Sequence, residues 1–136
     1  VDVSRVAGSK RDPVRIERLL RSLARNIATE VAITVLATDA GGADGPLGRH
    51  TVAEYLTILE RLMIIEDQPA WAPHLRSRAN LRTSPKRHFV DPSLAVAALA
   101  AGPDRLLADL NLLGLLFESL AIRDLRVLAQ PLDGQV

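Results

Sequence analysis

The sequence contains no cysteine, few aromatic residues and no long uninterrupted apolar run. The absence of cysteine excludes disulfides, thiolate zinc sites and a cysteine nucleophile. Aromatic residues make up only 3% of the chain, whereas leucine, alanine and valine are abundant. No stretch approaches the roughly 20 apolar residues of a membrane-spanning helix, and the first residues lack the apolar core of a signal peptide. We therefore expect a cytoplasmic chain without a membrane partner.

What the chain does contain is enough apolar material for a folded domain. Its 136 residues are 48% hydrophobic with a net charge of +1, which excludes global disorder and fits one compact domain, or one domain with part of another. The chain begins with Val1 and ends on a turn-like Asp133-Gly134 pair, which is typical of a hairpin. We therefore expect a piece of a longer protein, with a frayed tail as the alternative explanation of the end.

Hydrophobic periodicity and capping residues predict a mainly helical chain. Asp12 followed by Pro13 predicts a helix start, Asp91 before Pro92 predicts another, and Thr51 with Glu54 has the spacing of a capping box. Helices are expected over about 13–28, 30–39, 51–62, 92–101 and 109–124, and strands over 63–68, 86–90 and 124–129. A strand is the alternative for 31–36, where β-branched residues gather. The Leu-rich segment 106–120 is apolar nearly all round, which predicts that it is buried.

The order of these elements is that of a winged helix, so we expect an α+β fold that is predominantly helical. In that fold the helix over 51–62 would be the recognition helix, and the basic loop over 69–84 would be the wing between two strands. The glycine-rich loop 39–46 lacks the Lys and following Ser/Thr of a phosphate-cradling loop, which argues against a nucleotide site there.

Positive charge is concentrated in one window, because no acidic residue lies between Asp67 and Asp91. Clustered cations of this kind favour a polyanion, and we expect double-stranded DNA as a partner. The candidate nucleic-acid residues are Arg49, Arg61, Arg76, Arg78, Arg82, Lys86 and Arg87. For Lys86 and Arg87, a solvated strand edge is the alternative.

The single tryptophan and the three histidines are the other candidate site residues. Trp71 could stack on a base, although an anchor that holds the wing on the core is the favoured interpretation. His50, His74 and His88 fall in different elements, so we expect no metal site.

Three strings carry a resemblance to a known family: Thr51–Glu60 (TVAEYLTILE), Ser84–Leu94 (SPKRHFVDPSL) and Gly114–Glu118 (GLLFE). In this order they resemble the C-terminal domains of unknown function that follow the P-loop module in prokaryotic AAA+-type ATPases. The resemblance covers nearly the whole chain, although Pro92, Ser93 and Ser119 depart from the residues usual in that family.

The resemblance implies an ATPase whose ATP-binding module is absent from this sequence. It implies a linker over 1–12, a winged helix over 13–90 and, over 91–136, the start of a truncated module resembling the restriction-endonuclease fold. ATP and Mg²⁺ would belong to the missing ATPase module, which would be a partner in cis, so this fragment should need no cofactor. We expect the fragment itself not to be an enzyme.

Glu118 is the candidate catalytic residue that the nuclease-like resemblance implies. One carboxylate cannot hold a metal ion alone, and an ion pair of Glu118 with Arg123, Arg126 or a backbone donor is the favoured alternative. The role expected for the chain is therefore DNA binding. The rival role is protein interaction, including a homo-oligomer, if the Leu-rich segment 106–120 is exposed.

Overall fold

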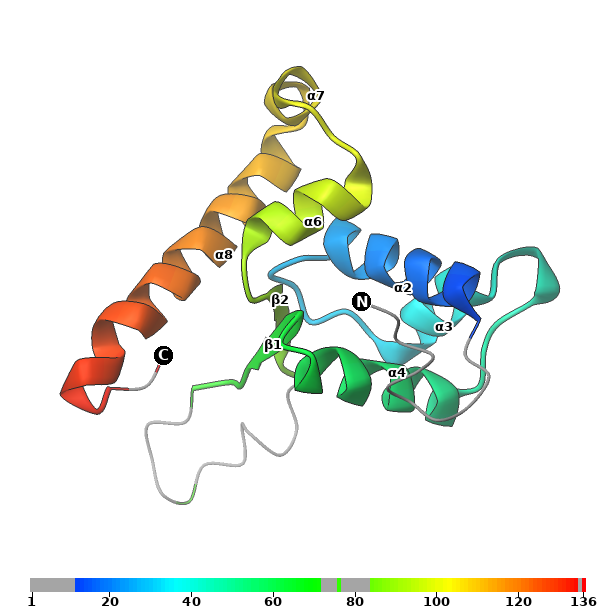
Figure 1. Cartoon of the computed structure of the whole chain (residues 1–136), viewed down its shortest axis with the longest axis horizontal. Helices are drawn as coiled ribbons and strands as arrows, with labels where there is room; N and C mark the ends of the chain where they lie inside the picture. Colours follow the sequence, from blue (N-terminus) through cyan, green and yellow to red (C-terminus); the bar gives the residue numbers. More distant parts are fainter. Residues whose placement is uncertain (1–11, 72–75, 77–83, 135) are drawn as a thin grey trace.

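The computed structural model of the chain is mainly helical, with one small antiparallel sheet (Figure 1). It describes residues 12–71, 76, 84–134 and 136. The elements are α2 (Pro13–Arg25), α3 (Ile33–Gly41), the 3-10 helix η1 (Gly42–Asp44), α4 (Arg49–Arg61), β1 (Ile65–Gln68), β2 (Lys86–Phe89), α6 (Pro92–Leu99), α7 (Pro103–Ala108), α8 (Leu110–Ala129) and the 3-10 helix η2 (Gln130–Leu132). This confirms an α+β chain that is predominantly helical.

Helix α2 begins as the sequence predicts, because Asp12 Oδ1 accepts the backbone N–H of Val14 at 3.0 Å and Pro13 occupies the first turn. It ends at Arg25, three residues before the predicted end. The reason is tertiary: Ala28 has a positive φ of 60°, and its N–H donates to the carbonyl of Arg87 at 2.9 Å.

Helix α3 starts three residues later than predicted. Thr29, just before the predicted start, forms an antiparallel bridge to Arg87, whose N–H donates to the Thr29 carbonyl at 3.0 Å. The chain is therefore extended before α3. The alternative of a strand over 31–36 is wrong, since helix begins at Ile33.

Helix α4 also starts at a different residue from the predicted one. Gly48 is its N-cap, and no side chain caps it. The predicted capping box of Thr51 and Glu54 is wrong because the helix has already begun at Arg49.

The predicted strands 63–68 and 86–90 are confirmed as a hairpin with slightly shorter arms. Ile65 pairs with Phe89 and Gln68 with Lys86, in an antiparallel register. Ile65 and Phe89 are both buried, so the hairpin closes one side of the core.

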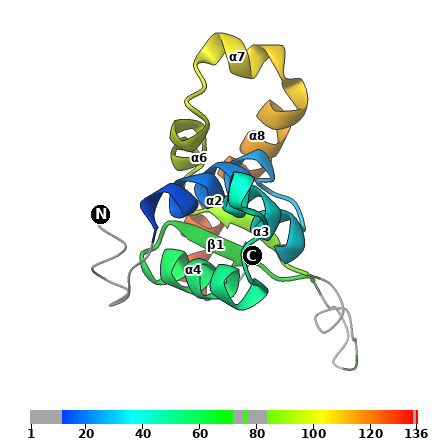
Figure 2. The same cartoon turned by 90° about the vertical axis from the view of Figure 1, so that its right-hand side faces the viewer.

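The core is formed by α2, α3, α4, the hairpin and α6, with α2 in contact with both α3 and α6 (Figures 1 and 2). Ala95 of α6 and Leu116 of α8 belong to the same buried cluster. As predicted, Asp91 caps α6, and its Oδ1 accepts the N–H of Ser93 at 2.9 Å.

The predicted strand over 124–129 is wrong, because α8 continues as a 20-residue helix to Ala129. Asp109 caps its start through the N–H of Leu112. The N–H of Gly134 donates to the Ala129 carbonyl at 3.0 Å, so Asp133-Gly134 closes a helix end rather than a hairpin. In Figure 1, α8 runs along the left edge of the molecule, and no other element lies outside it.

Candidate functional site

Helix α8 is joined to the hairpin by polar side chains that come from distant parts of the sequence. Lys86 Nζ lies 2.6 Å from Glu118 Oε1, and His88 Nδ1 lies 2.6 Å from Ser119 Oγ. Polar contacts hold α8 to the hairpin and to α6, and we call them together the polar junction. Its residues are Glu66, Asp67, Gln68, Lys86, His88, Asp91, Glu118, Ser119, Arg123 and Arg126.

His88 is the buried centre of the polar junction, with only 2% of its surface exposed. Its Nε2 lies 2.9 Å from Gln68 Oε1, which can only accept, so Nε2 carries the hydrogen and Nδ1 accepts from the Ser119 hydroxyl. Burial lowers the pKa of His88, and the nearby Arg126 lowers it further. The ring is therefore neutral at pH 7 and both nitrogens are satisfied.

Arg126 joins α8 to β1. Its guanidinium lies 2.6 Å from Glu66 Oε2 and donates to the backbone carbonyl of Asp67 at 3.2 Å. Both contacts reach β1, so α8 touches both strands of the hairpin.

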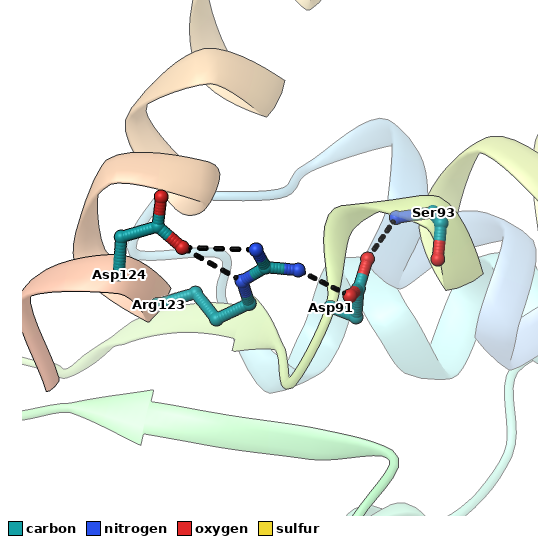
Figure 3. A network of polar contacts seen from close by, with 4 residues as sticks. All are labelled: Asp91, Ser93, Arg123 and Asp124. Atoms are coloured by element: carbon teal, nitrogen blue, oxygen red, sulfur yellow. Dashed lines mark hydrogen bonds and ion pairs between the residues drawn. The ribbon is translucent and has the colours of Figure 1, made fainter. Parts of the chain in front are cut away.

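Arg123 links α8 to the start of α6 (Figure 3). It donates to Asp91 Oδ2 at 2.5 Å and to Asp124 Oδ1 at 2.9 and 3.0 Å. The N–H of Ser93, followed by weaker contributions that include Arg123, lowers the pKa of Asp91. Hydrogen bonds to Asp124 and Asp91 raise the pKa of Arg123. One carboxylate thus caps α6 and anchors α8.

A shallow cleft of about 470 Å³ opens beside the junction. Val90 and Val127 form part of its wall, and Glu66, Arg123 and Arg126 bring its charged groups. Each of these charged groups is already in an ion pair, so they attract an additional charged ligand only weakly.

Two of the predicted DNA-contacting residues are neutralised within the molecule. Lys86 is paired with Glu118, and Arg87 NH1 lies 3.2 Å from each carboxylate oxygen of Asp67. The Arg87 side chain is only 11% exposed. Arg87 is therefore not a solvated strand edge, whereas Lys86 remains partly exposed, and each cation already has a carboxylate partner within the chain.

The other predicted cations are spread out. Arg49 and Arg61 lie at opposite ends of α4, and Arg76 lies in the sequence between β1 and β2. All three are exposed and form no ion pair with another described residue. Arg78 and Arg82 lie outside the described residues. The described part of the chain therefore does not bring the predicted set into one patch.

Trp71 is 84% exposed, so the interpretation that it anchors the wing on the core is wrong for this structure. Glu118 does form an ion pair, but its partner is Lys86 rather than Arg123 or Arg126. No group of three metal-binding side chains was found among the residues that the structure describes.

The opposite face of α8 is apolar and open. The helix and its two flanking helices α7 and η2 expose more than half of the surface of Leu107 (65%), Leu110 (70%), Phe117 (68%), Leu125 (51%), Leu128 (70%) and Leu132 (81%). We call these six residues the open face. The prediction that segment 106–120 is buried is wrong for this side, because the body of the molecule covers α8 from one direction only.

Sequence reasoning named Lys86 and Glu118 separately but missed their pairing, and it missed His88, Ser119 and Arg126 as partners. The available signal was that Glu118, Ser119 and Arg126 are polar residues within an otherwise strongly apolar segment. Local patterns do not reveal that residues 32 positions apart meet.

Comparison with known proteins gives one match. A family model described as a domain of unknown function, DUF8612, matches residues 1–105. The matched range ends inside α7, so α8 lies beyond it. No curated protein and no solved structure matches the chain. Among the described helices, none is both long and apolar enough to span a bilayer.

Proposed function

The chain belongs to the DUF8612 family of domains of unknown function, and we propose that it is a protein-interaction module. Its docking surface is the open face, and the partner it fits is a helix with a leucine-rich side. The sequence resemblance suggests the setting, in which such a module would couple an ATPase to a partner.

The observation that carries this proposal is the concentration of exposed apolar side chains on one helix. Leu110, Phe117 and Leu128 each expose about two thirds of their surface. Singly exposed leucines are ordinary on soluble proteins, but several exposed apolar side chains along one helix are typical of an interaction surface. A helix of 20 residues is about 30 Å long, which suits another helix lying along it.

The polar junction lies on the other side of α8 and supports the proposal because it fixes the position of the helix. Contacts of Glu118, Ser119 and Arg126 with the hairpin hold the helix in place before any partner arrives. A surface that is already ordered loses less conformational entropy on binding than a flexible one does.

The test compares the parent chain with a triple variant, Leu110→Glu, Phe117→Glu and Leu128→Glu. The parent should either self-associate or bind an apolar dye such as anilinonaphthalene sulfonate, and the triple variant should do neither while keeping its far-UV circular dichroism. Val35→Glu is the matched control, because Val35 is an exposed apolar residue on α3. A parent chain that is monomeric and does not bind the dye would refute the proposal.

Double-stranded DNA binding is a second candidate, favoured by the order of elements and by three exposed cations. The order α2, the bridge at Thr29, α3, α4 and the hairpin agrees with the order expected of a winged helix, in which α4 would be the recognition helix. Arg49, Arg61 and Arg76 are exposed and form no ion pair with a described residue. The neutralised Lys86 and Arg87 reduce the charge available to this candidate.

A gel-shift titration against salt tests the DNA candidate. Replacing Arg49, Arg61 and Arg76 together with Glu should abolish duplex binding at low salt, whereas Arg105→Glu, an exposed cation on α7, should leave it unchanged. DNA binding that is equal in the parent and the triple variant would reject this candidate.

A further inference from the structure

We infer that the partner of the open face is a second copy of this chain, joined to the first by antiparallel packing of α8 on α8. This inference rests on the proposed function and names its partner. The juxtaposition that carries it is a two-fold pattern of side chains along the helix.

The pattern follows from helix geometry. Eighteen residues make five full turns at 3.6 residues per turn, so Leu110 and Leu128 point in the same direction about 27 Å apart. Phe117 and Ala121 lie about 20° to either side of that direction. Both pairs have their midpoint at position 119, although the two residues of the second pair differ in size.

A two-fold axis at this midpoint would place each residue of a pair opposite the other member of that pair in the second copy. Leu110 of one copy would lie opposite Leu128 of the other, and the large Phe117 opposite the small Ala121. Large side chains facing small ones allow two helices to pack closely. Antiparallel helices also place opposite dipole ends near each other, whereas a parallel pair would oppose Phe117 to Phe117.

The charge on the face does not oppose this pairing. Asp124 lies within the open face, about 40° from the direction of Leu110 and Leu128. Its carboxylate is held by Arg123 of the same chain at 2.9 and 3.0 Å (Figure 3). Gly114, which would lie opposite Asp124, has open space where a Cβ would be. The net charge of +1 gives little repulsion between copies.

The available area is sufficient for a specific dimer. With exposures between 51% and 81%, the open face presents on the order of 700 Å² per copy, close to the about 800 Å² per partner of a standard interface. An isologous interface of this kind closes on itself and stops at two copies.

The absence of cysteine makes the register directly testable. Two single variants, Leu110→Cys and Leu128→Cys, are prepared separately and then mixed before treatment with a short bis-maleimide. The antiparallel dimer should give a cross-linked product in the mixture and almost none from either variant alone. A product from Leu110→Cys alone would indicate parallel packing and overturn the inference.

Sedimentation velocity on the unmodified chain gives the mass. The expected species is twice 14.7 kDa at micromolar concentration, and Phe117→Glu or Leu128→Glu should weaken the dimer more than about 30-fold, while Val35→Glu should not. A dimer that survives both α8 substitutions forms elsewhere and overturns the inference.

The dye experiment separates this inference from the proposed function. A monomeric parent chain whose dye binding disappears in the α8 triple variant would overturn the dimer but leave the open face as a docking surface. A monomeric parent chain that does not bind the dye would overturn both.

Discussion

The two faces of α8 differ, because polar groups share the packed side with leucines, whereas apolar side chains predominate on the open side. The side turned toward the hairpin carries Glu118, Ser119, Arg123 and Arg126, and the side turned away carries leucines and Phe117. A surface helix normally buries its apolar side and exposes its polar side. Here polar groups can face inward because each has a partner, and the apolar side remains open because no described element covers it.

The comparison shows that pairing, rather than polarity alone, decides which side of a helix packs on the body. A buried polar group costs little when it is hydrogen-bonded, as His88 is by Ser119 and Gln68. Leu116 adds apolar contact on the same inward side. Substitutions on the two faces should therefore differ in their effect on the free energy of unfolding.

The largest difference is expected between two adjacent residues, Leu116 and Phe117. Leu116→Ala should lower the free energy of unfolding by about 2–4 kcal/mol, because it leaves a cavity in the core. Phe117→Ala should change it by less than about 0.5 kcal/mol in the dilute monomer, because that ring is exposed. Urea denaturation followed by circular dichroism measures both, and equal losses would mean that the two faces are not distinct.

Ser119→Ala should have the next largest effect. It removes the donor to His88 Nδ1 and leaves a buried acceptor without a partner, which costs about 1–3 kcal/mol. Ser84→Ala, at an exposed serine, is the control and should change the stability little. A Ser119→Ala chain as stable as the parent would show that the buried hydrogen bond does not hold α8 in place.

Stability should also depend on pH through His88. Burial lowers its pKa below 6.5 in the folded chain, so below about pH 6.5 the unfolded chain binds more protons than the folded one. The contribution is fully present above that range and is lost as the pH falls through it. Urea midpoints from pH 7.5 to 5 should decrease, and His88→Gln should flatten that decrease. A parent chain whose midpoint is constant over this range would argue against a buried neutral ring.

The smallest effect is expected for the pair of Lys86 and Glu118. Both side chains are about 40% exposed, so their ion pair should contribute at most about 1 kcal/mol despite its 2.6 Å length. A double-mutant cycle of Lys86→Met and Glu118→Gln measures the coupling, which should shrink in 0.5 M salt. A coupling free energy several times larger would show that solvent does not screen this ion pair and that it contributes strongly to holding α8 on the hairpin.

Short-range features of the fold were predictable from the sequence. Asp12 and Asp91 were identified as caps, and the two strands of the hairpin were placed within two residues of their observed ends. Each of these depends on residues next to one another in the chain. The start of α3 was missed because Thr29 is extended by its bridge to Arg87, 58 positions away.

The candidate site was only partly predictable for the same reason. Lys86 and Glu118 were both singled out, as a phosphate contact and as a catalytic carboxylate, but the structure pairs them with each other. Arg87 was predicted to contact DNA, but its guanidinium forms an ion pair with Asp67. Charge counted along the chain misled here, because the neutralising carboxylates come from other elements.

By itself, the sequence determined that the first three quarters of α8 would be a strongly apolar helix, but it predicted a strand over 124–129, where the helix continues. It also determined the caps of α2 and α6 and the positions of the two strands, since these follow from local residue patterns. Only the tertiary structure decided which side of α8 faces the hairpin and which residues pair across it. The physical reason is that a helix can present any side to the body, and the side that packs is the one whose polar groups find partners and whose Leu116 finds the core.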